Sequence, residues 1–236
     1  MQKTIHRADS RGKAEHGWLH SRHTFSFAGY HDPQRMQFGK LRVLNDDVVE
    51  AGAGFGTHPH DNMEIVSIPL AGTLRHRDSM GNEHVIHAGE VQIMSAGTGI
   101  THSEYNDSQT EPVNFLQIWV LPKQRDIAPR YGQRRFEPAG RRNRLQLVVS
   151  PDGYDDSLSI NQDAWFSLLA LEAGSELEYT TRDPAYGVYL FLLDGQLNTA
   201  GESLAPRDGM GISGAERLSL STRDGAGVLL IEVPMA

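Results

Sequence analysis

Hydrophobic and polar residues alternate in short runs along most of this chain. From His23 onward the runs are separated by Gly, Asp and Asn residues, a pattern typical of an antiparallel β sandwich or barrel. No long stretch has the periodicity of an amphipathic helix. Met80-Gly81-Asn82, which lies between two charged runs, predicts a hairpin turn. The predicted strands are residues 42–44, 63–70, 72–77, 84–87, 91–94 and 114–121.

The run 114–121 is apolar on both faces of a predicted strand. Successive side chains of a strand point to opposite faces. One face carries Phe115, Gln117, Trp119 and Leu121, and the other carries Leu116, Ile118 and Val120. We therefore predict a central strand that is packed on both sides.

The pattern of the first half returns in the second half. Residues 188–197 match residues 65–74, and residues 205–212 resemble residues 86–93, with a glycine turn at the same place in each pair. The offset is roughly 120 residues, which indicates a duplicated module. We predict an all-β fold of two antiparallel β-barrel or jelly-roll domains, residues 1–136 and residues 137–236.

A basic segment, residues 123–144, joins the two predicted domains. It carries eight Lys or Arg residues against two acids, and prolines 122, 129 and 138 are expected to prevent any regular element there. One interpretation is a basic patch for an anionic partner. The other, which we favour, is a linker whose arginines pair with acidic residues elsewhere in this acidic chain.

Composition and charge exclude several classes of protein. The 236 residues are 39% hydrophobic and 22% charged, as in ordinary globular proteins. A formal net charge of −8 disfavours generic binding to nucleic acid or to anionic membranes. The N-terminus has no apolar signal segment, and the longest apolar run, residues 188–193, is too short to span a bilayer. We therefore expect a cytoplasmic protein with no membrane partner and no direct nucleic-acid partner.

Two short motifs carry the candidate chemistry: His58-Pro59-His60 and His102-Ser103-Glu104. Residues i and i+2 of a strand project to the same face, so each pair can aim both side chains at one point. The chain has no cysteine, so any metal must be held by nitrogen and oxygen. Three neutral imidazoles and one carboxylate suit Fe(II), Mn(II), Co(II), Ni(II) or Zn(II), and an octahedral ion would keep two positions open.

All 11 histidines lie at or before position 102. Counting forward from the three motif histidines by the repeat offset reaches the neighbourhood of Thr180, Arg182 and Ser221, which are poor ligands or none. We therefore expect one divalent metal per chain, held in the first module. The second module is expected to be structural, or at most a lid or an interface.

The same stretch resembles the two-part cupin signature. Gly52, His58, His60 and Glu64 fit its first part, with Gly72 one residue late, and Gly89, Gly97, His102 and Asn106 fit its second part. Ser95 stands in place of a proline in the second part, and four residues instead of two precede the histidine. These two differences in the second part restrict the resemblance to one branch of the cupins.

That branch is the pirin family of bicupins. The segments that resemble it are HTFSFAGYHDP (residues 23–33), LRVLNDDVVEAGAGFGTHPHDNMEI (41–65), IMSAGTGITHSEYN (93–106) and PRYGQRRF (129–136). The resemblance is close over about the first 136 residues and weaker afterwards. It implies a bicupin fold with a metal, Fe(II) first among those named above, bound by His58, His60, His102 and Glu104.

The choice of carboxylate depends on that resemblance. Glu64 has the same parity as His58 and His60 if the strand stays regular, and in the general cupin pattern this glutamate binds the metal. The pirin pattern implies Glu104 instead. Glu64 is then expected to accept a hydrogen bond from a ligand imidazole, and its simpler alternative is a salt bridge.

The remaining candidates are expected to have structural roles. His20, His23 and His31 lie in an aromatic-rich segment that they are expected to cap, and His76, His84 and His87 are expected on a solvated face of the hairpin. Candidates for an apolar pocket wall, most of them expected in the core, are Phe25, Phe27, Phe55, Met63, Phe115 and Trp119.

The resemblance to bacterial pirins implies a quercetin 2,3-dioxygenase, which cleaves flavonols with O2 to a depside and carbon monoxide. Glu104 would then be the catalytic residue that takes the proton of the flavonol 3-hydroxyl. A different hypothesis follows from animal pirins: a metal-binding, redox-sensing regulatory protein that docks on an enzyme or transcription-factor partner. A third is another cupin enzyme, such as an isomerase. An open metal site permits catalysis without requiring it.

Overall fold

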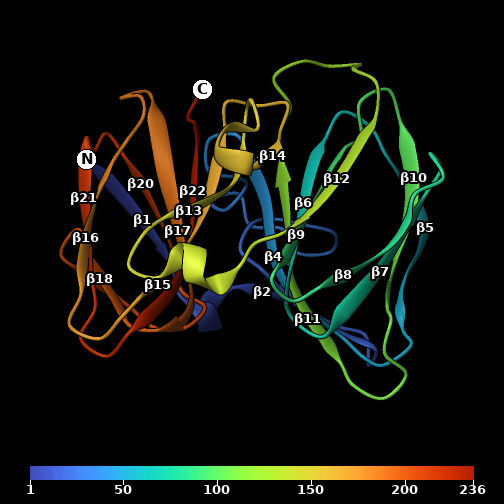
Figure 1. Ribbon diagram of the computed structural model, residues 1–236, viewed down its shortest axis with the longest axis horizontal. Coiled ribbons are helices and arrows are strands. Elements are labelled where there is room, and N and C mark those ends of the chain that lie inside the picture. The colour runs from blue at the N-terminus through green and yellow to red at the C-terminus, as the bar shows by residue number, and fades with distance from the viewer.

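Two β-barrels lie side by side in the computed structural model, which describes residues 1–236 (Figure 1). The first barrel consists of β2 (Gly12–Glu15), β3 (Leu19–His23), β4 (Leu41–Val49), β5 (Gly54–His60), β6 (Glu64–Ala71), β7 (Thr73–Asp78), β8 (Glu83–His87), β9 (Glu90–Ser95), β10 (Ile100–Asn106), β11 (Val113–Val120) and β12 (Arg130–Arg135). They form a seven-stranded sheet in the order β12-β9-β6-β11-β4-β3-β2 and a four-stranded sheet in the order β5-β10-β7-β8.

The second barrel repeats this plan. Its strands are β13 (Gln146–Ser150), β14 (Leu158–Ser159), β15 (Trp165–Leu171), β16 (Glu176–Thr180), β17 (Tyr186–Gly195), β18 (Leu197–Thr199), β19 (Glu202–Leu204), β20 (Gly209–Ser213), β21 (Arg217–Ser221) and β22 (Ala226–Pro234), joined by the N-terminal β1 (Gln2–His6). The sheets run β1-β20-β17-β22-β15-β13-β14 and β16-β21-β18-β19. The matching orders confirm the duplicated bicupin fold. The β13–β14 pair is parallel, and every other strand pair is antiparallel.

The N-terminal strand crosses to the other barrel. β1 lies within the range predicted for the first domain, yet it pairs with β20 of the second barrel, and Figure 1 shows its blue ribbon among the orange and red strands. In the first barrel the equivalent edge position, beside β9, is taken by β12. The two halves are therefore tied together by an exchanged edge strand as well as by the linker.

All six predicted strands are present: β6, β7 and β11 have the predicted length and are shifted by one residue, β8 and β9 are one and two residues longer, and β4 is considerably longer than predicted. The predicted turn joins β7 to β8, where the Asp78 N–H donates to the Asn82 carbonyl at 3.0 Å. The expectation of no regular element in the basic segment is wrong, because β12 fits between Pro129 and Pro138 and pairs with β9 along its whole length. Proline disfavours a strand only where its missing N–H is needed for pairing.

The helical content is confined to three short 3₁₀ turns, η1 (Ala8–Ser10), η2 (Pro138–Arg141) and η3 (Tyr154–Asp156). None of these turns is long or apolar enough to cross a membrane.

The two seven-stranded sheets pack against each other through a shared apolar core. On β11, Leu116, Ile118 and Val120 point into this core, while Phe115 belongs to a separate cluster inside the first barrel. β11 lies between β4 and β6, as predicted for a central strand packed on both faces. From the second barrel, Phe166, Phe191, Leu229 and Ile231 are among the residues that complete the core.

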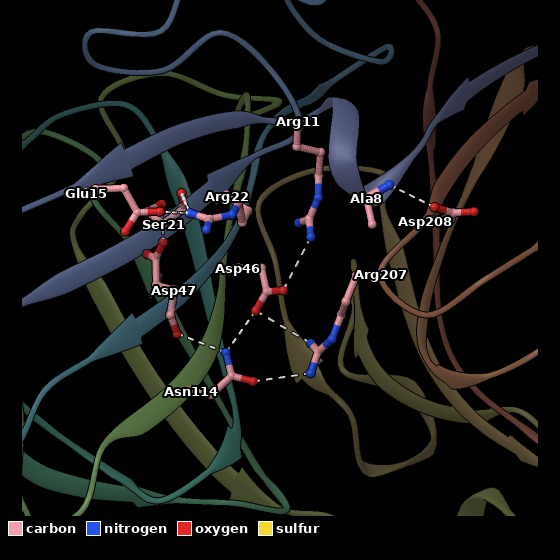
Figure 2. Close-up of polar contacts among 10 residues, drawn as sticks. All are labelled: Ala8, Arg11, Glu15, Ser21, Arg22, Asp46, Asp47, Asn114, Arg207 and Asp208. Atoms are coloured by element: carbon pink, nitrogen blue, oxygen red, sulfur yellow. Dashed lines mark hydrogen bonds and ion pairs between the residues drawn. The ribbon is translucent and has the colours of Figure 1, made fainter.

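A buried polar cluster extends the contact between the barrels (Figure 2). Asp46 of β4 lies between two guanidinium groups, with 3.5 Å to Arg11 Nη2 on one side and 3.5 Å to Arg207 Nη1 of the second barrel on the other. Asn114 donates to Asp46 Oδ1 at 2.8 Å and accepts from Arg207 at 3.3 Å. The Arg11 guanidinium also lies over the Phe191 ring, 5.3 Å from its centroid. Burial makes these charged contacts sensitive to the loss of either partner.

Half of the eight basic residues in the segment pair with an acid, which agrees in part with the favoured interpretation. Lys123 pairs with Asp163 at 2.8 Å, and Arg135 pairs with Glu137 at 3.0 Å. The other basic residues of the segment with an acidic partner are Arg134, which pairs with Asp156, and Arg142, which pairs with Glu172.

His6 of β1 packs against residues of the core between the barrels and gives a testable pH dependence. Its Nδ1 lies 2.8 Å from the Tyr189 hydroxyl, and its ring packs against Phe25. Burial, together with the nearby Arg35, lowers the pKa of His6 to about 4. Between pH ~6.5 and that value, the unfolded chain binds a proton at His6 that the folded chain does not.

We therefore expect the free energy of unfolding of the native protein, relative to that of His6→Asn, to fall as pH drops below ~6.5, by up to about 1.4 kcal/mol per pH unit. Above this pH the difference should be constant. Urea unfolding at stepwise pH measures it, with His87→Asn, at an exposed position, as the matched control. A difference that does not change with pH between 6.5 and 4 would contradict the assignment.

Candidate metal centre

Three histidines converge inside the first barrel, at one end of its four-stranded sheet. His58 and His60 lie on β5, and His102 lies directly opposite His58 on the neighbouring β10. One ring nitrogen from each of the three lies within 4.8 Å of the others. His102 is buried, whereas His58 and His60 are partly exposed. The spacing of the two sequence motifs therefore brings these imidazoles together as predicted.

The hydrogen bonds of two of these histidines leave nitrogen lone pairs free. His58 Nδ1 donates to the Gly56 carbonyl at 2.7 Å, so its Nε2 is unprotonated in the neutral ring. His102 Nε2 is buried and has no hydrogen-bond partner. A buried polar atom without a partner is uncommon in a folded protein, and at His102 Nε2 a bound metal ion would supply the partner.

Burial keeps two of the imidazoles neutral. It lowers the pKa of His60 to about 4, with a further contribution from His58. It lowers the pKa of His102 to about 2, assisted by the neighbouring His58 and His60. A metal ligand must be deprotonated, so these rings do not have to lose a proton before binding a metal at neutral pH.

Glu104 lies two residues along β10 from His102 and is completely enclosed. Its Oε2 accepts from Gln117 Nε2 at 2.8 Å, and its Oε1 accepts from Ser67 Oγ at 3.2 Å. Burial raises the pKa of Glu104 to about 7, and the nearby Asp47 contributes in the same direction. The sequence analysis did not identify Gln117 and Ser67 as partners of this carboxylate, although both lie on strand faces that point into the barrel.

His76 is placed differently from the expectation. It is fully buried beside the histidine cluster, and its Nδ1 lies 3.5 Å from His102 Nδ1, so its assignment to a solvated hairpin face is wrong. With His102 and Glu104 it forms a second group of potential ligand atoms within 4.8 Å of one another. The missed signal is the alternation of β7, because His76 shares a face with the apolar Leu74. His84 and His87 are exposed, as expected.

Glu64 also departs from the expectation, because it does not contact an imidazole. Its Oε2 accepts from Ser95 Oγ at 2.7 Å and from the backbone N–H of Asn161, in the second half of the chain, at 3.0 Å. Residues 61–63 separate β5 from β6, which belong to different sheets, so the parity counted from His60 does not carry through. Glu64 therefore faces the second barrel, on the same side of β6 as Val66 and Ile68.

Aromatic residues cover one side of the histidine cluster. Trp119 packs edge-on against His60 with 4.9 Å between ring centroids, and Phe27 packs against Trp119 at 5.2 Å. Met63 packs into the same apolar cluster as Trp119. Of the other wall candidates, Phe25 belongs to the core between the barrels, and Phe55 and Phe115 belong to a cluster behind the site. His23 packs against Phe27 at 5.3 Å, in agreement with its expected place in an aromatic cluster.

The second barrel has no comparable site. In its four-stranded sheet Tyr179 pairs with Leu218 as His58 pairs with His102, and Leu220 takes the place of Glu104. The positions found in the structure differ by a residue or more from Thr180 and Ser221, which the repeat offset predicted for His58 and His102. All three side chains belong to the apolar core of the second barrel. Apolar side chains thus fill the space that the metal ligands line in the first barrel.

A cleft of about 790 Å³ lies between the barrels and is lined by none of the clustered histidines. The donor set of the first barrel, in contrast, fits a divalent transition metal. Three imidazole nitrogens are its donors, and Glu104 lies within reach of His102 and His76 only, in a second group. Two of the imidazoles are neutral by burial, and one ligand nitrogen is left without a partner. His58, His60 and His102 would hold such an ion, with Glu104 beside His102.

Comparisons with known proteins give matches in both halves of the chain. Residues 4–120 match the family model described as Pirin, and residues 147–233 match the model of the quercetinase C-terminal cupin domain. The chain is 45% identical to a quercetin 2,3-dioxygenase of Escherichia coli K12, over 98% of each chain. It is 38% identical to a pirin-like protein of Caulobacter vibrioides, over 95% of this chain and 96% of that protein.

A solved structure also resembles the chain over its full length. The bacterial pirin YhhW from Escherichia coli, in complex with nickel(II), superposes on the chain with a TM-score of 0.95 at 44% sequence identity. The match covers 100% of both chains.

We expect the purified protein to bind about one divalent metal per chain, because only the first barrel carries a donor set. The double change His58→Ala/His60→Ala should abolish binding, whereas His84→Ala/His87→Ala, at two exposed hairpin positions, should preserve it. Elemental analysis after metal loading and desalting measures the content. Close to two ions per chain, or retention by the first double variant, would show that the metal is bound elsewhere.

The two buried glutamates should respond differently to removal of their charge. Glu104→Gln should weaken Zn(II) binding in a competition titration by more than the ~10–100-fold that is typical of a group acting only through a ligand. Glu64→Ala should leave the affinity close to native and instead lower the melting temperature, because it removes the acceptor through which Glu64 joins the barrels at the Asn161 N–H. The reverse order of affinities would assign the ligand role to Glu64.

Proposed function

The chain belongs to the pirin family, and we propose that it is a metal-dependent dioxygenase that cleaves quercetin-like flavonols with O2. The observation that carries the proposal is the group of three imidazoles, two of them partly open to solvent, with the buried carboxylate of Glu104 next to His102. The name of the E. coli relative, quercetin 2,3-dioxygenase, supports the choice of substrate. The products we expect are a depside and carbon monoxide.

His58, His60, His102 and Glu104 are the proposed metal ligands. We propose Fe(II) as the metal, and the nickel(II) complex of the related pirin makes Ni(II) the first alternative. When bound, the ion would supply a Lewis acid with open positions for the substrate hydroxyl and for dioxygen. The tautomer of His58 is fixed in advance by its hydrogen bond to the Gly56 carbonyl, so the ring presents Nε2 without rearrangement.

Glu104 is the proposed proton acceptor for the 3-hydroxyl of the flavonol. Gln117 and Ser67 each donate to one of its oxygens, which fixes the orientation of the carboxylate. A carboxyl group enclosed by protein has a raised affinity for protons, so it can hold the proton from the substrate until release. Trp119 and Phe27 would contact the flavonol rings beside His60 and exclude water from the reacting carbons.

The proposal is tested with Fe(II)-loaded protein under anaerobic conditions. Adding quercetin should shift the flavonol absorption band, and admitting air should consume O2 and release carbon monoxide. His102→Ala should abolish the shift and turnover together, because it removes one ligand of the metal. Arg135→Ala, in the basic segment, should preserve both. If loaded protein neither shifts the band nor consumes O2, and Arg135→Ala abolishes capture of a protein partner, the regulatory-protein hypothesis replaces this one.

A further inference from the structure

Next to the metal centre lies a pair of side chains that the proposed function does not use. His76 and Asp78 are two residues apart on β7, so both project to the same face, and neither side chain has any exposed surface. In the register of the sheet Asp78 lies opposite His102, and His76 lies opposite Glu104. The pair therefore borders the barrel interior directly behind the ligand strand β10.

Asp78, His76 and His102 are linked by two successive side-chain contacts. His76 Nε2 lies 3.1 Å from Asp78 Oδ2, and His76 Nδ1 lies 3.5 Å from His102 Nδ1. The second distance is at the long end of the range for a hydrogen bond. Beyond it, the Nε2 of His102 is the buried nitrogen without a partner.

The carboxylate of Asp78 determines which nitrogen is protonated in the rings of His76 and His102. An ionised carboxylate can only accept, so Asp78 places the proton of the neutral His76 on Nε2 and leaves its Nδ1 as an acceptor. That acceptor faces His102 Nδ1, which must then carry the proton of the His102 ring. The lone pair of His102 is thereby left on Nε2, the atom without a partner.

Asp78 is itself held rigidly by the β7–β8 turn. Its Oδ1 accepts from the backbone N–H of Met80 at 2.9 Å and of Asn82 at 3.1 Å, and its Oδ2 accepts from Asn82 Nδ2 at 2.8 Å. Burial opposes ionisation of Asp78, but the hydrogen bonds from Asn82 and His76 hold the pKa of its carboxyl below the ordinary value. The His76 ring is also packed against Tyr131, at 4.9 Å between centroids.

We propose that Asp78 and His76 are positioning residues that fix the tautomer and orientation of His102, so that His102 Nε2 is always presented to the metal. This is an extended form of the arrangement in which a carboxylate orients a metal-binding histidine, with a second imidazole between the two. His76 is not itself a ligand. If its Nδ1 bound the ion, no atom of His76 would be left to accept the proton of His102 Nδ1.

The native protein alone provides the first test, because Zn(II) is diamagnetic and is a borderline ion that such a site accepts. Long-range ¹H–¹⁵N correlation spectra of ¹⁵N-histidine protein loaded with Zn(II) report the tautomer of each ring. We expect His76 protonated on Nε2 and His102 protonated on Nδ1, with a zinc-induced ¹⁵N shift at His102 Nε2 and none of comparable size at His76. Protonation of His76 on Nδ1, or a ligand-sized shift at that atom, would overturn the proposal.

Asp78→Asn provides the second test, because it keeps the shape of the side chain and turns the acceptor Oδ2, which faces both His76 Nε2 and Asn82 Nδ2, into a donor. The side-chain amide of Asn82 can rotate to present its oxygen to this donor. The amide oxygen can still accept from Met80 and Asn82, but the amide NH₂ faces His76 Nε2 and donates to it. His76 must then be protonated on Nδ1, where it faces the N–H of His102. We expect the His76 tautomer to switch and Zn(II) affinity to fall by ~10–100-fold.

The matched control is His84→Gln, which removes an exposed imidazole from the adjacent strand of the same hairpin, where it stacks on Tyr131. Its affinity for Zn(II) and the tautomers of His76 and His102 should be native. If Asp78→Asn does not fold, His76→Phe removes the acceptor while filling the space, and it should lower Zn(II) affinity and leave His102 in a mixture of tautomers. Native affinity in either folded variant would refute the positioning role. These measurements depend on the metal site and not on the substrate, so they stand apart from the flavonol assay.

Discussion

The strict alternation of side chains on the central strands is the constraint on which this structure depends. In the seven-stranded sheet of the first barrel, β4, β6 and β11 are buried on both faces, and along part of β11 the two faces differ in chemistry. Leu116, Ile118 and Val120 point to the second barrel, whereas Gln117 and Trp119 of the same strand point to the metal centre. A shift of one residue in register would exchange the two sets, exposing polar groups to the apolar core and apolar groups to the ligands.

This alternation also places two adjacent acidic residues on opposite faces of β4. Asp46 of β4 lies in the polar cluster between the barrels, paired with Arg11 and Arg207, whereas Asp47 points into the first barrel and accepts from Ser21. Burial raises the pKa of Asp47 to about 7, and its negative charge acts on Glu104 across the barrel. Asp47 therefore contributes to the electric field at the metal centre, while Asp46, its neighbour in sequence, contacts Arg207 of the second barrel.

The sequence was sufficient to predict what depends on local spacing. His58, His60 and His102 could be placed together because His-x-His fixes one face of a strand and the duplicated glycine turns indicate the barrel that closes it. Glu64 was assigned the wrong neighbours because its parity was counted through residues 61–63, where the chain passes from one sheet to the other. His76 was missed because polar residues on a hairpin usually face solvent, and its burial depends on β10 pairing with β7, a contact between strands that are distant in the sequence. Likewise, the pairing of β1 with β20 leaves no local signal, because an edge strand is defined by its partner.

The distribution of apolar residues explains why a metal-binding barrel carries a metal-free copy of itself. Inside the first barrel the buried apolar clusters contain only six and four residues, because imidazoles and carboxylates occupy much of the interior. The core between the barrels contains 22 buried residues, drawn from both halves of the chain, and the interior of the second barrel contains 15. Burial of apolar surface is the main favourable contribution to folding, so most of it is made outside the barrel that binds the metal. A buried imidazole nitrogen without a partner, such as His102 Nε2, destabilises the fold without metal, and a shared core of this size allows the first barrel to hold the ring in place before the metal binds. Tyr179, Leu218 and Leu220 in the second barrel are thus part of the same arrangement: by packing where ligands would otherwise lie, they add to the stability on which the open site depends.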